Sequence, residues 1–277
     1  MRLRPLVLVA AIVVAGAALA HPGDTRAASA FAPAASATVH PGVQLFTNGA
    51  QCTANFIYTN GTDTYIGQAA HCSGTGGNTA TNGCTSGSLP IGTAVQITGA
   101  AHPGTLVYNS WLTMQSAHEA DANTCAYNDL ALVRIDPADV GSTNPSMPFF
   151  GGPTAVGSQT LNAGDTVYTY GNSELRGGVT QLSPKRGVSV GDTGGGWSHG
   201  CYTVTPGIPG DSGSGFLDAT GHAIGILSTV EIAPIPASNN FGDLSRELAY
   251  ANAHGFSVSL VAGDVPFRAA VLPPLPL

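Results

Sequence analysis

The chain is poor in charged side chains and carries no recognisable metal-binding pattern. Lysine and arginine together number 9 and aspartate and glutamate 16 among 277 residues, for a formal net charge of −7 at pH 7. An acidic chain with so few cations does not attract polyanions, so no nucleic acid partner is expected and an anionic membrane surface is a poor one. No C-x-x-C pair and no H-E-x-x-H sequence occurs, so neither a metal nor another cofactor is expected.

Long apolar runs are absent except at the start of the chain. Residues 1–30 combine a basic beginning, an apolar run from Leu6 to Ala20 and small residues with A-x-A spacing, the pattern of a secretory signal peptide. The run is shorter than the roughly 18 residues that a membrane span needs. We therefore expect an exported protein with no membrane span after cleavage, which can fall after Ala20, Ala30 or Ala37.

Cysteine is scarce, and its number is odd. The five cysteines are Cys52, Cys72, Cys84, Cys125 and Cys201. In an exported chain they predict disulfides, with at least one thiol left over. Hydrophobic residues make up 43% of the chain, which excludes a disordered protein.

The body of the chain is typical of an all-β protein. Short apolar or alternating runs are separated by N-G, G-T and similar turn signals from residue 42 onward. The strands expected in the later part are Ala94 to Thr98, Gly104 to Tyr108, Leu130 to Ile135, Thr166 to Tyr170, Gly187 to Val190, Gly215 to Leu217 and His222 to Val230. Many short strands with Gly and Pro turns predict a sandwich or barrel.

One helix and four segments complete the predicted organisation. Near the C-terminus Asp243 stands as a helix cap before leucines at helical spacing, and Gly255 follows as a stop. The segments are a signal peptide at 1–30, a short N-terminal arm at 31–40, one functional domain at 41–262 and a Pro-rich tail at 263–277.

Three short stretches contain residues suited to nucleophilic catalysis. In "PGDSGSGF", Ser212 stands between two glycines, and a serine needs a neighbouring base to become a nucleophile. His71 in "YIGQAAHC" and Asp129 in "YNDLALVRI" could supply the base and its carboxylate partner. Taken singly, His71 could be a histidine at a strand end, Asp129 a turn cap and Ser212 part of a flexible loop.

Taken together, the three stretches resemble the chymotrypsin-like (trypsin-fold) serine proteases. That family carries A-A-H-C, then D-h-A-L with h apolar, then G-D-S-G-G, and this chain has "AAHC", "DLAL" and "GDSGSG" in the same order. The resemblance extends over about residues 40 to 255. It implies two packed six-stranded antiparallel barrels with a short C-terminal helix. It also implies that Ser212 attacks a carbonyl, His71 accepts its proton and Asp129 orients the imidazole.

The resemblance assigns further residues. The backbone N–H groups of Gly210 and Ser212 would form the oxyanion hole, and a disulfide would join Cys52 to Cys72. Substrate would be bound by Pro206, Ser228 and Val230.

The chain departs from the family pattern at three points. Ser214 replaces the last glycine of G-D-S-G-G, and the usual cysteine shortly before the serine is absent. The I-V-G-G start, whose freed amino group would pair with Asp211, is also absent. We therefore expect an internal arginine to pair with Asp211, with Arg176 and Arg186 as the candidates ahead of Arg134.

The remaining cysteines and the specificity pocket are less constrained. We expect Cys84 and Cys125 to lie in loops near the segments of His71 and Asp129, and they are the first choice for a second disulfide. Cys201 would then be free. Because Pro206 at the pocket floor offers no carboxylate, we expect an uncharged P1 residue to be preferred over Lys or Arg. Glu231, next to the pocket wall, is the residue that could reverse this preference.

The sequence thus predicts a secreted, monomeric serine endopeptidase acting on protein or peptide substrates. Two alternatives use the same fold. One is an esterase or amidase, because the acyl-transfer chemistry is shared. The other is a catalytically weak or inactive homologue that binds partners through its loops.

Overall fold

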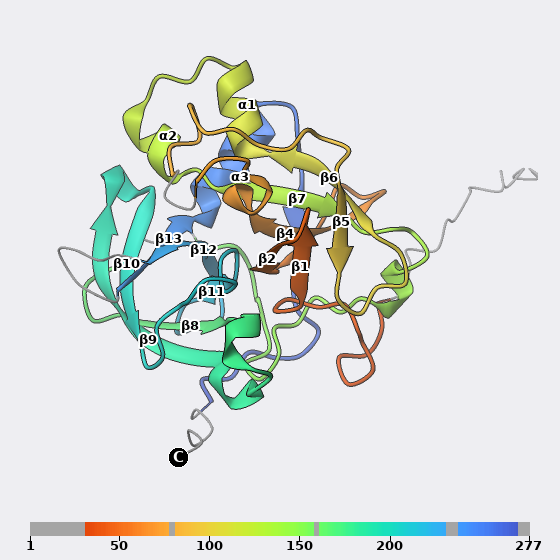
Figure 1. The fold of residues 1–277 in the computed structure, drawn as a ribbon. Helices are drawn as coiled ribbons and strands as arrows, with labels where there is room; N and C mark the ends of the chain where they lie inside the picture. Colours follow the sequence, from red (N-terminus) through yellow and green to blue (C-terminus); the bar gives the residue numbers. More distant parts are fainter. Residues whose placement is uncertain (1–30, 78–80, 158–160, 231–237, 271–277) are drawn as a thin grey trace, which may run out of the picture.

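The computed structural model describes residues 31–77, 81–157, 161–230 and 238–270, which form two β units packed together (Figure 1). The predicted signal peptide and the last residues of the predicted tail lie outside this range. The first unit contains β1 (Gln44–Thr47), β2 (Ala50–Thr53), β3 (Ile57–Thr59), β4 (Thr64–Ala69), β5 (Ala94–Ile97), β6 (Gly104–Asn109), β7 (Leu130–Arg134) and β14 (Ser259–Leu260). The second contains β8 (Thr166–Tyr170), β9 (Pro184–Thr193), β10 (Ser198–Thr203), β11 (Gly215–Leu217), β12 (Ala223–Val230) and β13 (Asn239–Asp243).

The first unit is an antiparallel sheet of eight short strands in the order β14-β3-β4-β7-β6-β5-β1-β2. β2 and β3 are separated only by residues 54–56, yet they stand near opposite ends of this order. The sheet must therefore curl round on itself. Backbone bonds from Ala54 N to Val43 O and from Asn55 N to Gly67 O connect the bend to both sides of the sheet.

The second unit is a closed barrel of six strands in the order β10-β13-β12-β11-β8-β9. Apolar side chains fill it from several strands, and Phe216 of β11 stacks on Phe241 of β13 with ring centroids 4.3 Å apart. His199 of β10 also lies inside, 2% exposed, with one ring nitrogen bonded to Asp192 and the other to Asp243.

The all-β class with two packed units is confirmed. The first unit has eight strands where six were expected, because the bend at 54–56 divides one stretch into β2 and β3 and the two-residue β14 adds to the edge of β3. The strands expected between residues 94 and 230 are present, with shifts of a few residues at their ends. β10 and β13 were not predicted.

In the described part of the chain, three α-helices accompany the strands: α1 (Ser110–Ser116), α2 (Ala122–Tyr127) and α3 (Leu244–Ala253). α3 is the predicted C-terminal helix, capped as expected by the Asp243 side chain, which accepts a hydrogen bond from Arg246 N. α1 and α2 were not predicted. Five short 3₁₀ turns also occur: η1 (Ala70–Ser73), η2 (Val140–Ser142), η3 (Glu174–Arg176), η4 (Thr180–Leu182) and η5 (Gly194–Gly196).

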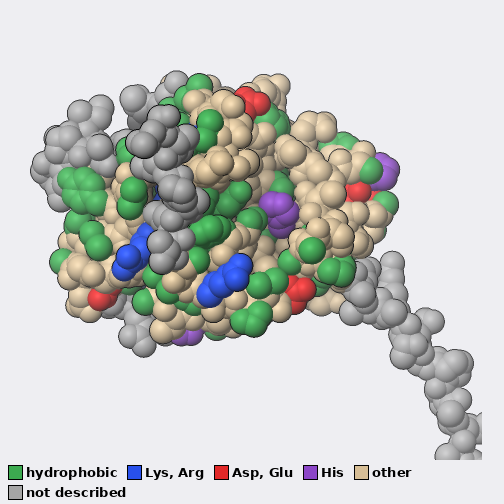
Figure 2. All heavy atoms as spheres, turned by 90° about the horizontal axis from the view of Figure 1, so that it is seen from below, with side chains coloured by type: hydrophobic (Ala, Val, Ile, Leu, Met, Phe, Trp, Pro, Cys, Tyr) green, Lys and Arg blue, Asp and Glu red, His purple; other side chains and the backbone are tan. Residues whose placement is uncertain are grey.

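The two units share an apolar interface that brings their loops together. One buried cluster contains residues of both, including Tyr58 and Leu130 from the first sheet with Tyr168 and Ile226 from the barrel. On the outer surface seen from below in Figure 2, the charged side chains are scattered and not gathered into a patch. Among the described residues, no helix has the length and apolar character needed to cross a membrane.

Candidate active site

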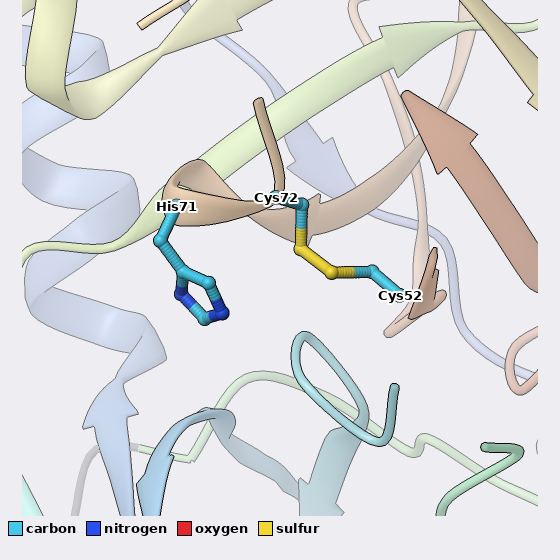
Figure 3. Close-up of side chains that lie close together, drawn as sticks. All are labelled: Cys52, His71 and Cys72. Carbon is cyan, nitrogen blue, oxygen red and sulfur yellow. A yellow bond between two sulfur atoms is a disulfide. The ribbon is translucent and has the colours of Figure 1, made fainter. Parts of the chain in front are cut away.

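His71 lies where β4 ends and the short turn η1 begins. Its backbone N–H donates to Asp129 Oδ1 at 2.9 Å, and its ring Nδ1 lies 2.7 Å from Asp129 Oδ2. The next residue, Cys72, is disulfide-bonded to Cys52 of β2. Figure 3 shows the imidazole and the disulfide projecting from the same turn. The bridge therefore ties the segment that carries the histidine to β2.

Asp129 immediately precedes β7, which pairs with β4 so that Leu130 lies opposite Ala69. This register places the aspartate beside the turn that carries His71. The side chain of Asp129 is buried, and its Oδ2 also accepts a hydrogen bond from Ser228 Oγ at 2.6 Å. Burying a carboxylate is costly unless its oxygens accept hydrogen bonds, and here both oxygens do.

Glu247 of α3 lies behind Asp129 and is fully buried. Its Oε1 accepts the backbone N–H of Asp129 at 2.9 Å, while Oε2 has no hydrogen-bond partner within the described part of the chain. Burial raises the pKa of Glu247 well above its usual value; the hydrogen bond from Asp129 opposes this shift, and the charge of that carboxylate adds to it. Burial and the neighbouring charge therefore both favour the neutral form of Glu247.

The pKa of His71 is raised by its surroundings. Burial of the ring lowers it, but the charge and hydrogen bond of Asp129 raise it by more. The carboxylate thus stabilises the imidazolium form. Because Nδ1 faces Asp129, Nε2 is the ring nitrogen left to exchange a proton.

Ser212 lies in the loop between β10 and β11, at the junction of the two β units. Its carbonyl accepts the N–H of Thr53 from β2, and the following Gly213 donates to Leu227 O of β12. A side chain on Gly213 would collide with Ala69 N, two residues before His71. The loop therefore passes close beside the histidine turn. Between described residues, neither Ser212 Oγ nor His71 Nε2 makes a hydrogen bond. In enzymes without substrate the bond between nucleophile and base is commonly long, and it tightens in the substrate complex.

The same loop carries two N–H groups with no acceptor among the described residues, those of Gly210 and Ser212. Between them, Asp211 N donates to Ile208 O. Gly210 adopts φ +94, a conformation that favours glycine. Two free amides next to a serine hydroxyl can stabilise an oxygen that becomes negatively charged.

Asp211 is completely buried and pairs with two cations. Of the candidate arginines, Arg176 forms the ion pair, as expected; Lys185 of β9, which sequence reasoning missed, lies 3.1 Å away. Burial raises the pKa of Asp211, but Lys185 and Arg176 lower it by more, so the carboxylate is held ionised. The loop is thus anchored by internal residues.

The residues assigned to substrate binding lie in this loop and on β12. Pro206 is exposed, and its carbonyl accepts a hydrogen bond from Arg176 Nη2 at 3.1 Å. Ser228 and Val230 lie on β12, with the Ser228 hydroxyl turned to Asp129. Glu231 lies outside the described residues.

The structure contains two disulfides, Cys52–Cys72 and Cys84–Cys125, and leaves Cys201 free and buried. Cys125 lies on α2, not in the loop that the sequence suggested.

Among the residues that the structure describes, two clusters have the atom spacing of metal ligands, and the atoms of each make other bonds. In the first, His71 lies near Cys52 and Cys72, whose sulfurs are bonded to each other and supply no thiolate. In the second, Asp139 accepts bonds from Ala101 N and from His102.

Several side chains around the site were not found from the sequence. Gln51 and Thr53 of β2 bond to Gly210 O, Ser173 bonds to Pro209 O, and Glu247 bonds to Asp129 N. Each is a polar residue in a stretch without a motif. Only the three-dimensional fold brings them to the loop.

Comparisons with known proteins agree with this architecture. The family model described as "Trypsin-like peptidase domain" matches residues 52–226. Protease A of Thermobifida fusca has a similar structure, with a TM-score of 0.50 and 18% identity, covering 81% of this chain and 99% of that one. The Nocardiopsis protease gives a TM-score of 0.48 and 17% identity over 80% of this chain and 98% of its own. No curated protein sequence matches the chain.

Proposed function

The chain belongs to the trypsin-like peptidase family, and from this membership and the site geometry we propose that it is a secreted serine endopeptidase. The observation that carries the proposal is the buried Asp129 carboxylate, which holds His71 by both its backbone N–H and Nδ1 beside the Ser212 loop. The enzyme would act as a monomer on protein or peptide substrates, without a cofactor.

In the proposed reaction, Ser212 Oγ attacks the carbonyl carbon of the scissile bond while His71 Nε2 takes the hydroxyl proton. Asp129 keeps Nδ1 protonated and stabilises the imidazolium that forms. The N–H groups of Gly210 and Ser212 stabilise the negative oxygen of the tetrahedral intermediate.

Collapse of that intermediate breaks the C–N bond, and His71 gives its proton to the leaving amine. The product is an acyl-enzyme on Ser212. Water, deprotonated by the same His71 nitrogen, then attacks the ester carbon. The bond to Ser212 Oγ breaks, His71 returns the proton to that oxygen, and the acid is released.

The test uses Ser212→Ala and Asp129→Asn, with Ser146→Ala as control. Ser146 is also buried and donates a hydrogen bond, to Asp264, but it takes no part in the proposed machinery. Ser212→Ala should abolish hydrolysis of casein and labelling by a serine-directed phosphonate, and Asp129→Asn should lower kcat about 10⁴-fold. Retained activity in Ser212→Ala would refute the mechanism.

The same measurements distinguish the two alternatives. An esterase or amidase would be labelled by the phosphonate and cleave small esters or amides but not casein. A binding homologue would be labelled weakly or not at all.

We also propose a preference for an uncharged P1 residue over Lys or Arg. The guanidinium of Arg176 is bonded to the carbonyl of Pro206, so a positive charge lies next to the assigned pocket floor. A cationic side chain entering there would lose water and meet a like charge. A P1-varied peptide library tests this, and a higher kcat/KM for Arg or Lys than for Phe, Leu and Ala would contradict it.

Secretion is part of the proposal. It is supported by the signal-peptide pattern of residues 1–30 and by the two disulfides, which persist in oxidising compartments. N-terminal sequencing of protein from the culture medium should find a start after Ala20, Ala30 or Ala37. Retention of the full-length chain inside the cell would refute it.

A further inference from the structure

The loop that carries Gly210 is held through its carbonyl groups. Pro209 O accepts a hydrogen bond from Ser173 Oγ at 2.5 Å. Gly210 O accepts bonds from Gln51 Nε2 at 3.0 Å and Thr53 Oγ1 at 2.8 Å. Two successive peptide groups are therefore fixed by side chains from other segments.

Fixing the Pro209 carbonyl also fixes the Gly210 N–H. In a trans peptide the C=O and N–H of one peptide group point in opposite directions. With the carbonyl bonded to Ser173, the amide of the Pro209–Gly210 peptide faces away from that serine. This is one of the two amides that have no acceptor among the described residues.

The proton of Ser173 is directed by its own surroundings. Ser173 is buried, 3% exposed, and its Oγ accepts the N–H of Leu175 at 3.1 Å. The hydroxyl proton therefore serves the Pro209 carbonyl. The backbone N–H of Ser173 donates to Asp211 Oδ1 at 3.1 Å, so the residue contacts the loop on both sides of Gly210.

Gly210 itself cannot supply this rigidity. Its positive φ lies in a region that glycine enters and leaves at little cost, so the peptide on its N-terminal side can rotate unless something holds it. A side chain at this position would collide with Gln51 Oε1 and Ser173 Oγ. The glycine gives the loop its shape, and its neighbours must keep that shape.

We propose that the Ser173 hydroxyl is a positioning group that locks the Pro209–Gly210 peptide with its N–H toward the reacting carbonyl oxygen. The inference rests on the proposed function, in which that N–H is an oxyanion donor. Without the hydroxyl, the peptide can turn over and one of the two donors is lost. In this role the Ser173 hydroxyl does not bind substrate and acts only through the Pro209–Gly210 peptide.

The experiment compares Ser173→Ala with the wild type and with Ser146→Ala, which loses a buried hydrogen bond away from the loop. We expect kcat to fall about 10- to 100-fold in Ser173→Ala, below the 10²- to 10³-fold loss for complete removal of an oxyanion donor. KM should stay within about twofold, because the lost interaction acts in the transition state. Ser146→Ala should keep both constants.

A transition-state analogue gives a second measurement. A peptide boronic acid, which forms a tetrahedral adduct, should bind Ser173→Ala more weakly by the same factor as kcat falls. Ser173→Cys replaces the hydroxyl by a larger thiol, which donates more weakly and at a longer distance, and should give an intermediate kcat. It also decides the question if Ser173→Ala does not fold.

The possible results separate this inference from the proposed function. A wild type that does not hydrolyse peptides overturns the proposed function. If the wild type is active and folded Ser173→Ala has the same kcat, only the inference about Ser173 is overturned. If the alanine variant does not fold, full kcat in Ser173→Cys overturns it in the same way. A raised KM at constant kcat also overturns it, because the residue would then act on substrate binding.

Discussion

Replacing Lys185 by methionine should leave the protein at least as stable at neutral pH, although it removes an ion pair. The Lys185 side chain is almost fully buried on β9, and its ammonium lies 3.1 Å from Asp211, which also pairs with Arg176. Asp211 therefore keeps one cation in the variant. Methionine fills a similar volume without a charge.

The magnitude follows from the pKa of Lys185. Burial lowers that pKa from 10.5 to about 8, since the attraction of Asp211 is too weak to compensate and Arg176 adds repulsion. One pKa unit corresponds to about 1.4 kcal/mol, so the charged side chain costs the folded state about 3 kcal/mol at pH 7. Because the folded-state pKa is the lower one, the unfolded chain holds the proton more tightly. This cost is therefore relieved as the pH rises from about 8 to 10.5.

The assay is urea unfolding of wild type and Lys185→Met at several pH values from 7 to 10. The stability advantage of the variant should shrink by about 2 to 3 kcal/mol over this range as the wild-type ammonium is deprotonated. Arg186→Met, at the exposed next position of β9, should show a pH-independent difference from wild type. A constant difference for Lys185→Met, or its unfolding at pH 7, would show that the buried ammonium does not destabilise the folded state.

Three further predictions concern other buried titratable groups. Because Asp129 raises the pKa of His71, kcat/KM should increase with pH through an apparent pKa above 6.5, and a midpoint at or below 6.5 would contradict this. Burial lowers the pKa of His199, but its partners Asp192 and Asp243 raise it by more. The protonated ring therefore stabilises the folded state below pH 6.5, and this stabilisation is lost as the pH rises through the folded-state pKa. In urea unfolding, His199→Gln should therefore lose about 3 kcal/mol at pH 5 and less at pH 9, and an equal loss would count against this. Glu247→Gln keeps an acceptor for Asp129 N and should have the stability of the wild type at pH 7, whereas Glu247→Leu should lose about 1 to 3 kcal/mol. Equal stabilities of the two variants would show that the bond to Asp129 N does not stabilise the fold.

The sequence predicts much of the first sheet and the neighbourhood of the catalytic candidates because local pattern and contact coincide there. The apolar run after Asp129 forms β7, and the run before His71 forms β4; their pairing brings the two side chains together. The cap at Asp243 likewise depends on residues only three positions away. Such features need little information from the rest of the fold.

Elements with polar interiors could not be predicted. β10 reads "SHGCYT", and its inward-facing His199 replaces an apolar residue that would have marked a strand. β13 reads "NNFGD" and contains one large apolar residue. In both strands, pairing within the closed barrel outweighs weak local preference.

The groups that hold the Ser212 loop were missed for a different reason. Gln51 is 159 residues from Gly210 in the sequence, and Ser173 is 36 residues from Pro209. A single polar side chain in an ordinary stretch carries no sign of such a distant partner. Only closure of the barrel against the first sheet brings them within hydrogen-bond distance.

The fifth cysteine bears on how the chain acquires its two bridges. Cys201 lies in the barrel core, and burial raises the pKa of its thiol to about 12. Only the thiolate exchanges with disulfides, and a pKa near 12 leaves on the order of one molecule in 10⁵ reactive at pH 7. In the unfolded chain the thiol lacks this burial, so its pKa is the ordinary one and it can exchange with the other four cysteines. Closure of the barrel thus protects the Cys201 thiol from disulfide exchange. The rate at which an alkylating reagent modifies Cys201 in the folded protein therefore measures how often the barrel opens.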